Sequence, residues 1–156
     1  ITHGHSDHAR WGHGRYLATH AAGPVMRHRL GDVALEGIAY GEPRRIGGVT
    51  VTFRPAGHVP GSAQIAVERD GEVWVVSGDY KVEPDGLSEP FEPVRCHAFV
   101  SECTFGLPVF RWAPQAEVMA GVNRWWAANA ALGRTSIIGA YALGKAQRIM
   151  TGVDAS

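Results

Sequence analysis

The sequence predicts an α/β (α+β) protein in which a β-rich part is followed by a helix-rich part. Between residues 49 and 76, apolar residues alternate over segments of strand length. From Pro114 to Leu132, apolar residues instead recur at helical spacing in an alanine-rich segment. This change in periodicity places the best domain boundary in the turn region at residues 108–114.

The first elements are a loop and a short helix. Residues 1–9 are expected to form a strand end that runs into a loop. A helix is expected at residues 25–30, because Pro24 suits a first helical turn and Gly31-Asp32 closes the segment.

Several strands are expected next. Residues 49–54 and 63–68 alternate as strands with one buried face do. Asp70-Gly71 is a hairpin signal, and residues 73–76 return as the partner strand. This partner strand is apolar on both faces, so we expect a sheet covered on both sides. Residues 97–100 predict another short buried strand.

The helix-rich part is expected to contain a βα unit. Residues 114–132 predict a helix with Pro114 in its first turn and Gly133 just past its end. Residues 135–140 predict a strand and residues 143–150 a helix.

Composition limits the function classes. The chain has 156 residues, of which 45% are hydrophobic and 19% charged, as in a soluble globular protein. The formal net charge is zero, so bulk electrostatics gives no support to nucleic-acid binding. Cys96 and Cys103 suggest no disulfide framework, which predicts a reduced, cytoplasmic setting. The sequence contains no apolar run long enough to span a membrane.

The chain is expected to be part of a longer protein. Residue 1 is Ile, and a segment rich in potential metal ligands begins at His3. The last residues follow directly on a helix-like segment.

The strongest functional signal is the segment His3-Gly4-His5-Ser6-Asp7-His8. Side chains alternate along an extended chain, so His3 and His5 can converge on one metal ion. Asp7 and His8, on the loop beyond, can turn to a second metal. Imidazole and carboxylate together suit zinc and similar ions. The alternative is a histidine-rich surface loop.

Two further ligand candidates follow predicted strands. His58 comes after the alternating strand, and Asp79 comes after the apolar strand. Each is preceded by glycine, which lets the backbone approach a ligand closely. Taken alone, His58 is more often a loop residue and Asp79 a turn residue or helix cap.

These motifs resemble those of the metallo-β-lactamase superfamily, whose successive metal motifs are H-x-H-x-D-H, a later Gly-His and a later Gly-Asp. The segments at residues 57–63 and 101–106 resemble the β-CASP nucleases of that superfamily. Residues 77–86 and 104–112 are most similar to the bacterial DNA-ligase-associated exonucleases. Residues 141–147 resemble a helix start early in the β-CASP insert.

The resemblance implies an αββα sandwich that is incomplete here because N-terminal strands are missing. Residues 1–113 would form the metallo-β-lactamase-like domain, and residues 114–156 the beginning of the β-CASP-like cap.

The resemblance also implies residue roles. The first metal ion would be bound by His3, His5 and His58. The second would be bound by Asp7, His8 and a bridging Asp79, with zinc as the first choice and manganese as the second. The implied catalytic residues are Asp7, Asp79 and Glu102, the last of which would position a cap histidine. That histidine and a final metal-binding histidine are expected outside this chain.

Two residues are candidates for substrate contact. Ser62 can touch a phosphate or bond the backbone near the metal loop, and we favour the structural role. Lys145 can contact nucleic acid or face solvent at a helix start.

The implied function is a metal-dependent phosphodiesterase, a DNA exonuclease that works in repair with a DNA ligase and a helicase. The first alternative is an RNA-processing β-CASP ribonuclease. The others are a small-molecule metallohydrolase acting on a thioester or lactone, and a non-catalytic nucleic-acid-binding scaffold. The chain as given is expected to be inactive alone, because a metal ligand and the general acid lie elsewhere.

Overall fold

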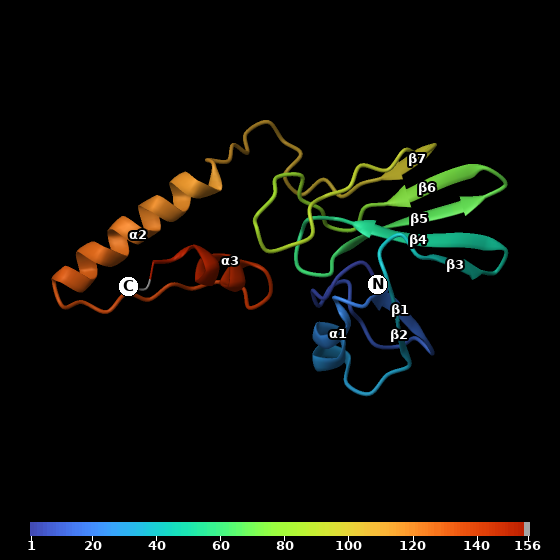
Figure 1. Ribbon diagram of the computed structural model, residues 1–156, viewed down its shortest axis with the longest axis horizontal. Helices are drawn as coiled ribbons and strands as arrows, with labels where there is room; N and C mark the ends of the chain where they lie inside the picture. Colours follow the sequence, from blue (N-terminus) through green and yellow to red (C-terminus); the bar gives the residue numbers. More distant parts are fainter. Residues whose placement is uncertain (155–156) are drawn as a thin grey trace. The chain divides into compact units, whose positions relative to one another are not determined.

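The computed structural model describes residues 1–154 and divides the chain into two compact units, Ile1–Glu102 and a unit that begins at Cys103. The described residues form a mixed α+β structure (Figure 1), which confirms the predicted mixture of strands and helices. The units divide earlier in the chain than the expected boundary at residues 108–114. The assignment of two domains by their family type stays a prediction.

A five-stranded sheet forms the larger part of the first unit (Figure 1). Its strands, in spatial order, are β3 (Pro43–Ile46), β4 (Val49–Pro55), β5 (Ala63–Arg69), β6 (Glu72–Val76) and β7 (Ala98–Val100). The pairs from β3 to β6 are antiparallel, whereas β7 runs parallel to β6. Four of the five strands therefore form a meander, and the longer connection before β7 carries the chain to the parallel edge.

The hairpin between β5 and β6 is confirmed. Asp70 has φ 50° and Gly71 has φ 83°. Positive φ at both central residues is the type I′ geometry, whose twist matches that of the flanking strands. The predicted strand at residues 49–54 is confirmed as well, and Phe53 at its centre is 1% exposed.

The prediction that β6 and β7 are buried on both sides is wrong for the described part of the chain. Val75 is fully buried, but its neighbours Trp74 and Val76 are 51% and 42% exposed. On β7, Phe99 and Val100 are 43% and 48% exposed. Alternation along a strand sends neighbouring side chains to opposite faces, and only one of these faces is packed among the described residues.

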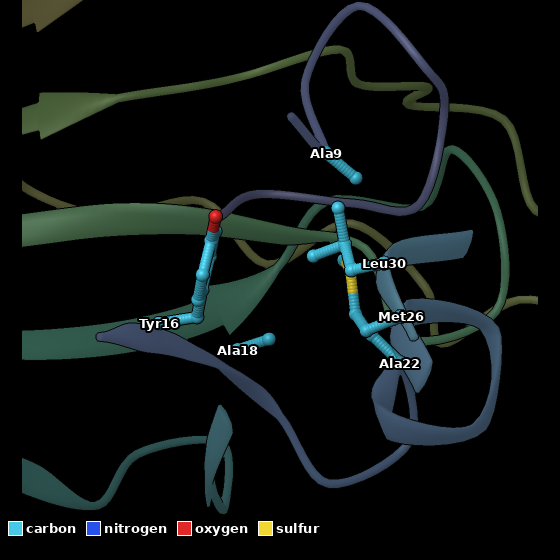
Figure 2. Packing of buried hydrophobic residues seen from close by; sticks show 6 residues of the cluster. All are labelled: Ala9, Tyr16, Ala18, Ala22, Met26 and Leu30. Carbon is cyan, nitrogen blue, oxygen red and sulfur yellow. The ribbon is translucent and has the colours of Figure 1, made fainter. Parts of the chain in front are cut away.

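A smaller layer in the first unit consists of β1 (Tyr16–Thr19), β2 (Leu35–Ile38) and α1 (Gly23–Leu30). The two strands are parallel, as expected when a helix connects them. Figure 2 shows one cluster of buried side chains in this layer and the loop before it, with Ala9, Tyr16, Ala18, Ala22, Met26 and Leu30 labelled. The helix was predicted, but strands β1, β2 and β3 were not, because each is only four residues long and shows no sustained alternation.

The N-terminal segment forms no strand within the described residues, so the strand end expected at residues 1–9 is wrong and only the loop is correct. The Ile1 nitrogen donates to the Leu17 carbonyl oxygen at 2.8 Å, and the Thr2 carbonyl oxygen accepts from the Ala63 N–H at 2.8 Å. One hydrogen bond to β1 and one to β5 therefore fix the segment between the two layers.

The second unit contains α2 (Gln115–Ala131) and α3 (Lys145–Gly152). Pro114 precedes α2, and Gly133, with φ 65°, follows its end, as predicted. The strand predicted at residues 135–140 is wrong, since the described tail has no strand there and Ile137 is 86% exposed. The expected βα unit is therefore reduced to its helix. Of the helices described, none combines the length and the apolar character that a membrane span requires.

Candidate metal centre

Three loops of the first unit carry the predicted metal ligands. The loop before β1 holds His3, His5, Asp7 and His8. The loop between β4 and β5 holds His58, and the loop after β6 holds Asp79. Backbone hydrogen bonds link these loops: the Ala63 N–H donates to the Thr2 carbonyl oxygen at 2.8 Å, and the Lys81 N–H donates to the Ala56 carbonyl oxygen at 2.9 Å.

The first loop is folded back by its own backbone. The His5 carbonyl oxygen accepts from the N–H of His8 at 3.1 Å and from that of Ala9 at 2.8 Å. These bonds close a single helical turn, which returns His8 toward the residues before it. His3 is fully buried in this loop, whereas Asp7 is exposed.

Glycine and serine shape the loop that carries His58. Gly57 has φ 74°, and a Cβ there would lie 2.2 Å from the Lys81 carbonyl oxygen, so only glycine fits. The buried Ser62 hydroxyl accepts from the backbone N–H of His58 at 3.1 Å and of Val59 at 3.2 Å. The position of His58 is therefore set by its own loop.

A second layer of polar contacts supports this loop. The Tyr40 hydroxyl donates to the Ser62 carbonyl oxygen at 2.8 Å, and the Gly61 N–H donates to Oε2 of Glu89 at 3.0 Å. Burial, and then the adjacent Glu89 carboxylate, raise the pKa of Tyr40, so its hydroxyl keeps the proton it donates. Neither Tyr40 nor Glu89 was predicted from the sequence, because nothing in their local sequence marks them.

Four of the predicted ligands converge on one point. Nδ1 of His5 lies 3.0 Å from Nε2 of His3 and 3.2 Å from Nε2 of His58. Oδ2 of Asp79 lies 3.6 Å from Nε2 of both His3 and His58. The four ligand atoms all lie within 4.8 Å of one another. Ligand atoms around one tetrahedral zinc ion are separated by about 3.4 Å, given bond lengths of about 2.1 Å, so this set fits such an ion.

The remaining predicted ligands lie on the other side of Asp79. Its Oδ1 atom is 3.3 Å from Nε2 of His8, which in turn is 3.7 Å from Oδ2 of Asp7. The two oxygens of one carboxylate therefore face different groups of ligands. This is the arrangement that a bridging carboxylate needs.

Burial keeps the central histidines neutral. Loss of solvation, and then the neighbouring His8, His58 and His5, lower the pKa of His3 from 6.5 to about 2. Burial also lowers the pKa of His58, although the Asp79 carboxylate opposes this change. Only a neutral imidazole offers a lone pair to a metal ion, so the surroundings of His3 and His58 favour metal binding over protonation.

Other predicted residues lie outside the cluster of donor atoms. Glu102, half-buried after β7, interacts electrostatically with His58 and opposes the lowering of its pKa. Ser62 is 1% exposed and turned to the backbone of its own loop. Lys145 belongs to the second unit, where its Nζ lies 5.0 Å from the centre of the Tyr141 ring.

Thr2 lies beside the cluster and was not singled out from the sequence. Its Oγ1 atom is 3.2 Å from Nδ1 of His3 and 3.1 Å from Nδ1 of His8. The only signal in the sequence is that a hydroxyl residue directly precedes the first histidine.

The fold and the site together define an α+β chain with a half-buried histidine–aspartate cluster suited to a metal ion. Its whole length is 29% identical to part of a protein named probable DNA ligase from Opitutus terrae. A ribonuclease of Thermus thermophilus is 37% identical over 73 residues, which cover 46% of the chain. The DNA cross-link repair protein pso2/snm1 of Schizosaccharomyces pombe is 25% identical over 76% of the chain.

The chain covers only part of these relatives, namely 16% of the ligase, 17% of the ribonuclease and 23% of the repair protein. No family model matches the chain. The names of all three relatives refer to DNA or RNA, and together they connect the chain with nuclease chemistry.

Proposed function

We propose that this chain carries the metal centre of a metallo-β-lactamase-fold nuclease of the β-CASP group, similar to the exonucleases associated with bacterial DNA ligases. The observation that carries the proposal is the position of Asp79, whose two carboxylate oxygens face two groups of ligands. Similarity along the whole chain to part of a protein named as a DNA ligase supports the choice of group. The five-stranded sheet would belong to an incomplete αββα sandwich.

Two divalent ions would be held at this centre, with zinc the first choice and manganese the second. The first would be bound by His3, His5 and His58, the second by Asp7 and His8, and both by Asp79. When bound, such a pair supplies Lewis acidity and lowers the pKa of water at the site.

The protein's own residues orient the reaction. Asp7 has a side chain 66% exposed, so that substrate can reach it, and it would orient the attacking water. Glu102 would accept a hydrogen bond from a proton-donating histidine in another part of the protein and so orient it. The lowered pKa values of the buried His3 and the half-buried His58 would keep both imidazoles neutral and able to bind metal.

DNA is the proposed substrate, attacked from an end, during repair alongside a DNA ligase and a helicase. Two of the relatives are named for DNA, which favours this substrate. RNA is the second candidate, because the relative with the highest identity of the three is named a ribonuclease.

The test pairs metal content with cleavage. Because this chain is expected to be inactive alone, the purified full-length protein is assayed on end-labelled single-stranded DNA, double-stranded DNA and RNA, with His5→Ala and Asp79→Ala as inactivating variants. His28→Ala is the matched control, because His28 is exposed on α1. We expect two bound ions and cleavage from DNA ends that both inactivating variants lose. Metal without cleavage of any nucleic acid favours a small-molecule hydrolase, and absence of metal contradicts the proposal.

Glu102→Gln tests the role of this orienting carboxylate in the same assay. The variant is expected to keep both ions and to lower the cleavage rate, because glutamine keeps the shape of the side chain but removes its charge. Loss of metal from this variant would place Glu102 among the ligands instead.

A further inference from the structure

A single hydroxyl group lies behind both groups of ligands. The Thr2 Oγ1 atom is 3.2 Å from Nδ1 of His3 and 3.1 Å from Nδ1 of His8. The opposite ring nitrogens of these histidines face the two sides of Asp79, since Nε2 of His3 lies near Oδ2 and Nε2 of His8 near Oδ1. Thr2 therefore contacts one histidine from each group.

The tautomers of the two histidines follow from this geometry. An imidazole that binds metal through Nε2 must carry its proton on Nδ1, and that N–H needs an acceptor. A threonine hydroxyl oxygen has two lone pairs, so it can accept from both rings at once. Valine has nearly the same shape and offers no acceptor.

Thr2 is itself held firmly by the loops that carry the other ligands. Its carbonyl oxygen accepts from the Ala63 N–H at 2.8 Å, at the end of the His58 loop. Its side chain lies against Gly78, where a Cβ would be 2.6 Å from the Thr2 Cβ and 2.8 Å from its Oγ1. Gly78 directly precedes Asp79, so Thr2 is in contact with both of the other ligand-bearing loops.

We propose that Thr2 is a positioning residue that fixes the tautomer and ring orientation of His3 and His8 and so prepares both metal sites together. The inference rests on the proposed metal centre. It predicts a specific signature, because loss of one hydroxyl should weaken both sites, whereas loss of an unshared ligand should weaken mainly its own.

The test compares Thr2→Val, which removes only the acceptor, with Thr2→Ser, which retains the hydroxyl. Stepwise zinc affinities are measured by competition with a chromophoric chelator. Thr2→Val should weaken both steps by about 10- to 100-fold, the usual effect of removing an outer-shell partner, and Thr2→Ser should restore most of the affinity. Thr52→Val, on β4, is the matched control and should bind as the unsubstituted protein does.

A second measurement does not depend on the variants folding. In the zinc-loaded unsubstituted protein, nitrogen-15 NMR should show Nδ1–H protons on His3 and His8 that exchange slowly with water. Unchanged affinity in Thr2→Val, weakening of one site alone, or Nδ1 without a proton would each overturn the role of Thr2 while leaving the metal centre intact. Failure of the unsubstituted protein to bind zinc would overturn the proposed function, and this inference with it.

Discussion

Oδ1 of Asp79 lies 3.3 Å from Nε2 of His8, while the other oxygen of the same carboxylate faces His3 and His58 at 3.6 Å. The side chain is 31% exposed, so it is reachable from solvent yet held between imidazoles. A residue in this position joins the two groups of ligands. Its replacement should therefore affect both groups.

Asp79→Asn is the sharpest substitution at this position, because the amide keeps the shape but loses the charge and one oxygen. Cleavage should fall by about three orders of magnitude or more, since several kcal/mol of charge stabilisation depend on both ions and each 1.4 kcal/mol is about tenfold in rate. Metal content and single-turnover cleavage measure the effect. A variant that binds two ions and cleaves normally would show that Asp79 does not bridge.

His5→Ala and Asp7→Ala should separate the two metal sites. The Nδ1 atom of His5 lies next to His3 and His58 in the first group of ligands. Asp7 lies near His8 in the second group. Each variant is expected to retain one ion of the two. Elemental analysis after dialysis gives the stoichiometry, and complete loss of metal in both variants would indicate one indivisible site.

Gly57→Ala should destabilise the loop of His58. The new Cβ would lie 2.2 Å from the Lys81 carbonyl oxygen, on a backbone with φ 74°. Gly47→Ala is the matched control, since Gly47 also has positive φ, at 55°, but no atom lies within 4 Å of its Cβ position. The control should cost about 1–2 kcal/mol of unfolding free energy from backbone strain, and Gly57→Ala about 3 kcal/mol or more. Equal costs in urea denaturation would mean that the close approach to Lys81 is unimportant.

Ser62→Ala tests whether that hydroxyl supports the loop. The substitution leaves the backbone N–H groups of His58 and Val59 without their buried acceptor. Each unsatisfied group costs about 1–3 kcal/mol, so unfolding free energy and zinc affinity should both fall. Thr135→Ala, at an exposed position, is the control and should change stability by less than about 0.5 kcal/mol. If Ser62→Ala instead leaves stability and metal affinity unchanged and weakens substrate binding alone, the substrate role is favoured.

Periodicity predicted those elements that are long or marked by strong turn signals. The hairpin at Asp70-Gly71 and helix α2 between Pro114 and Gly133 follow from local chemistry, because glycine and proline restrict the backbone in the same way in any fold. Strands β1 and β2 were not predicted, because four residues are too few to show a clear alternation of apolar and polar side chains. The expected strand at residues 135–140 was wrong, because a strand also needs a partner, and none is paired with it in the described residues.

The exposure of the side chains on β6 also depended on the tertiary structure. The apolar sequence of β6 predicted cover on both sides, yet Trp74 and Val76 are exposed while Val75 is fully buried. A sequence can show that a residue is apolar, but whether it is covered depends on what packs against that face.

For the candidate site, the sequence by itself determined the chemical types of the ligands and their spacing, from His3 through His8 to His58 and Asp79. Only the tertiary structure decided which ring nitrogen of each histidine faces the cluster, that the two oxygens of Asp79 face different groups, and that Thr2 lies behind both. The physical reason is that coordination depends on the direction of the lone pairs and on metal–ligand distances that must be correct to about 0.2 Å. That precision arises where three loops, distant in the sequence, are bonded to one another.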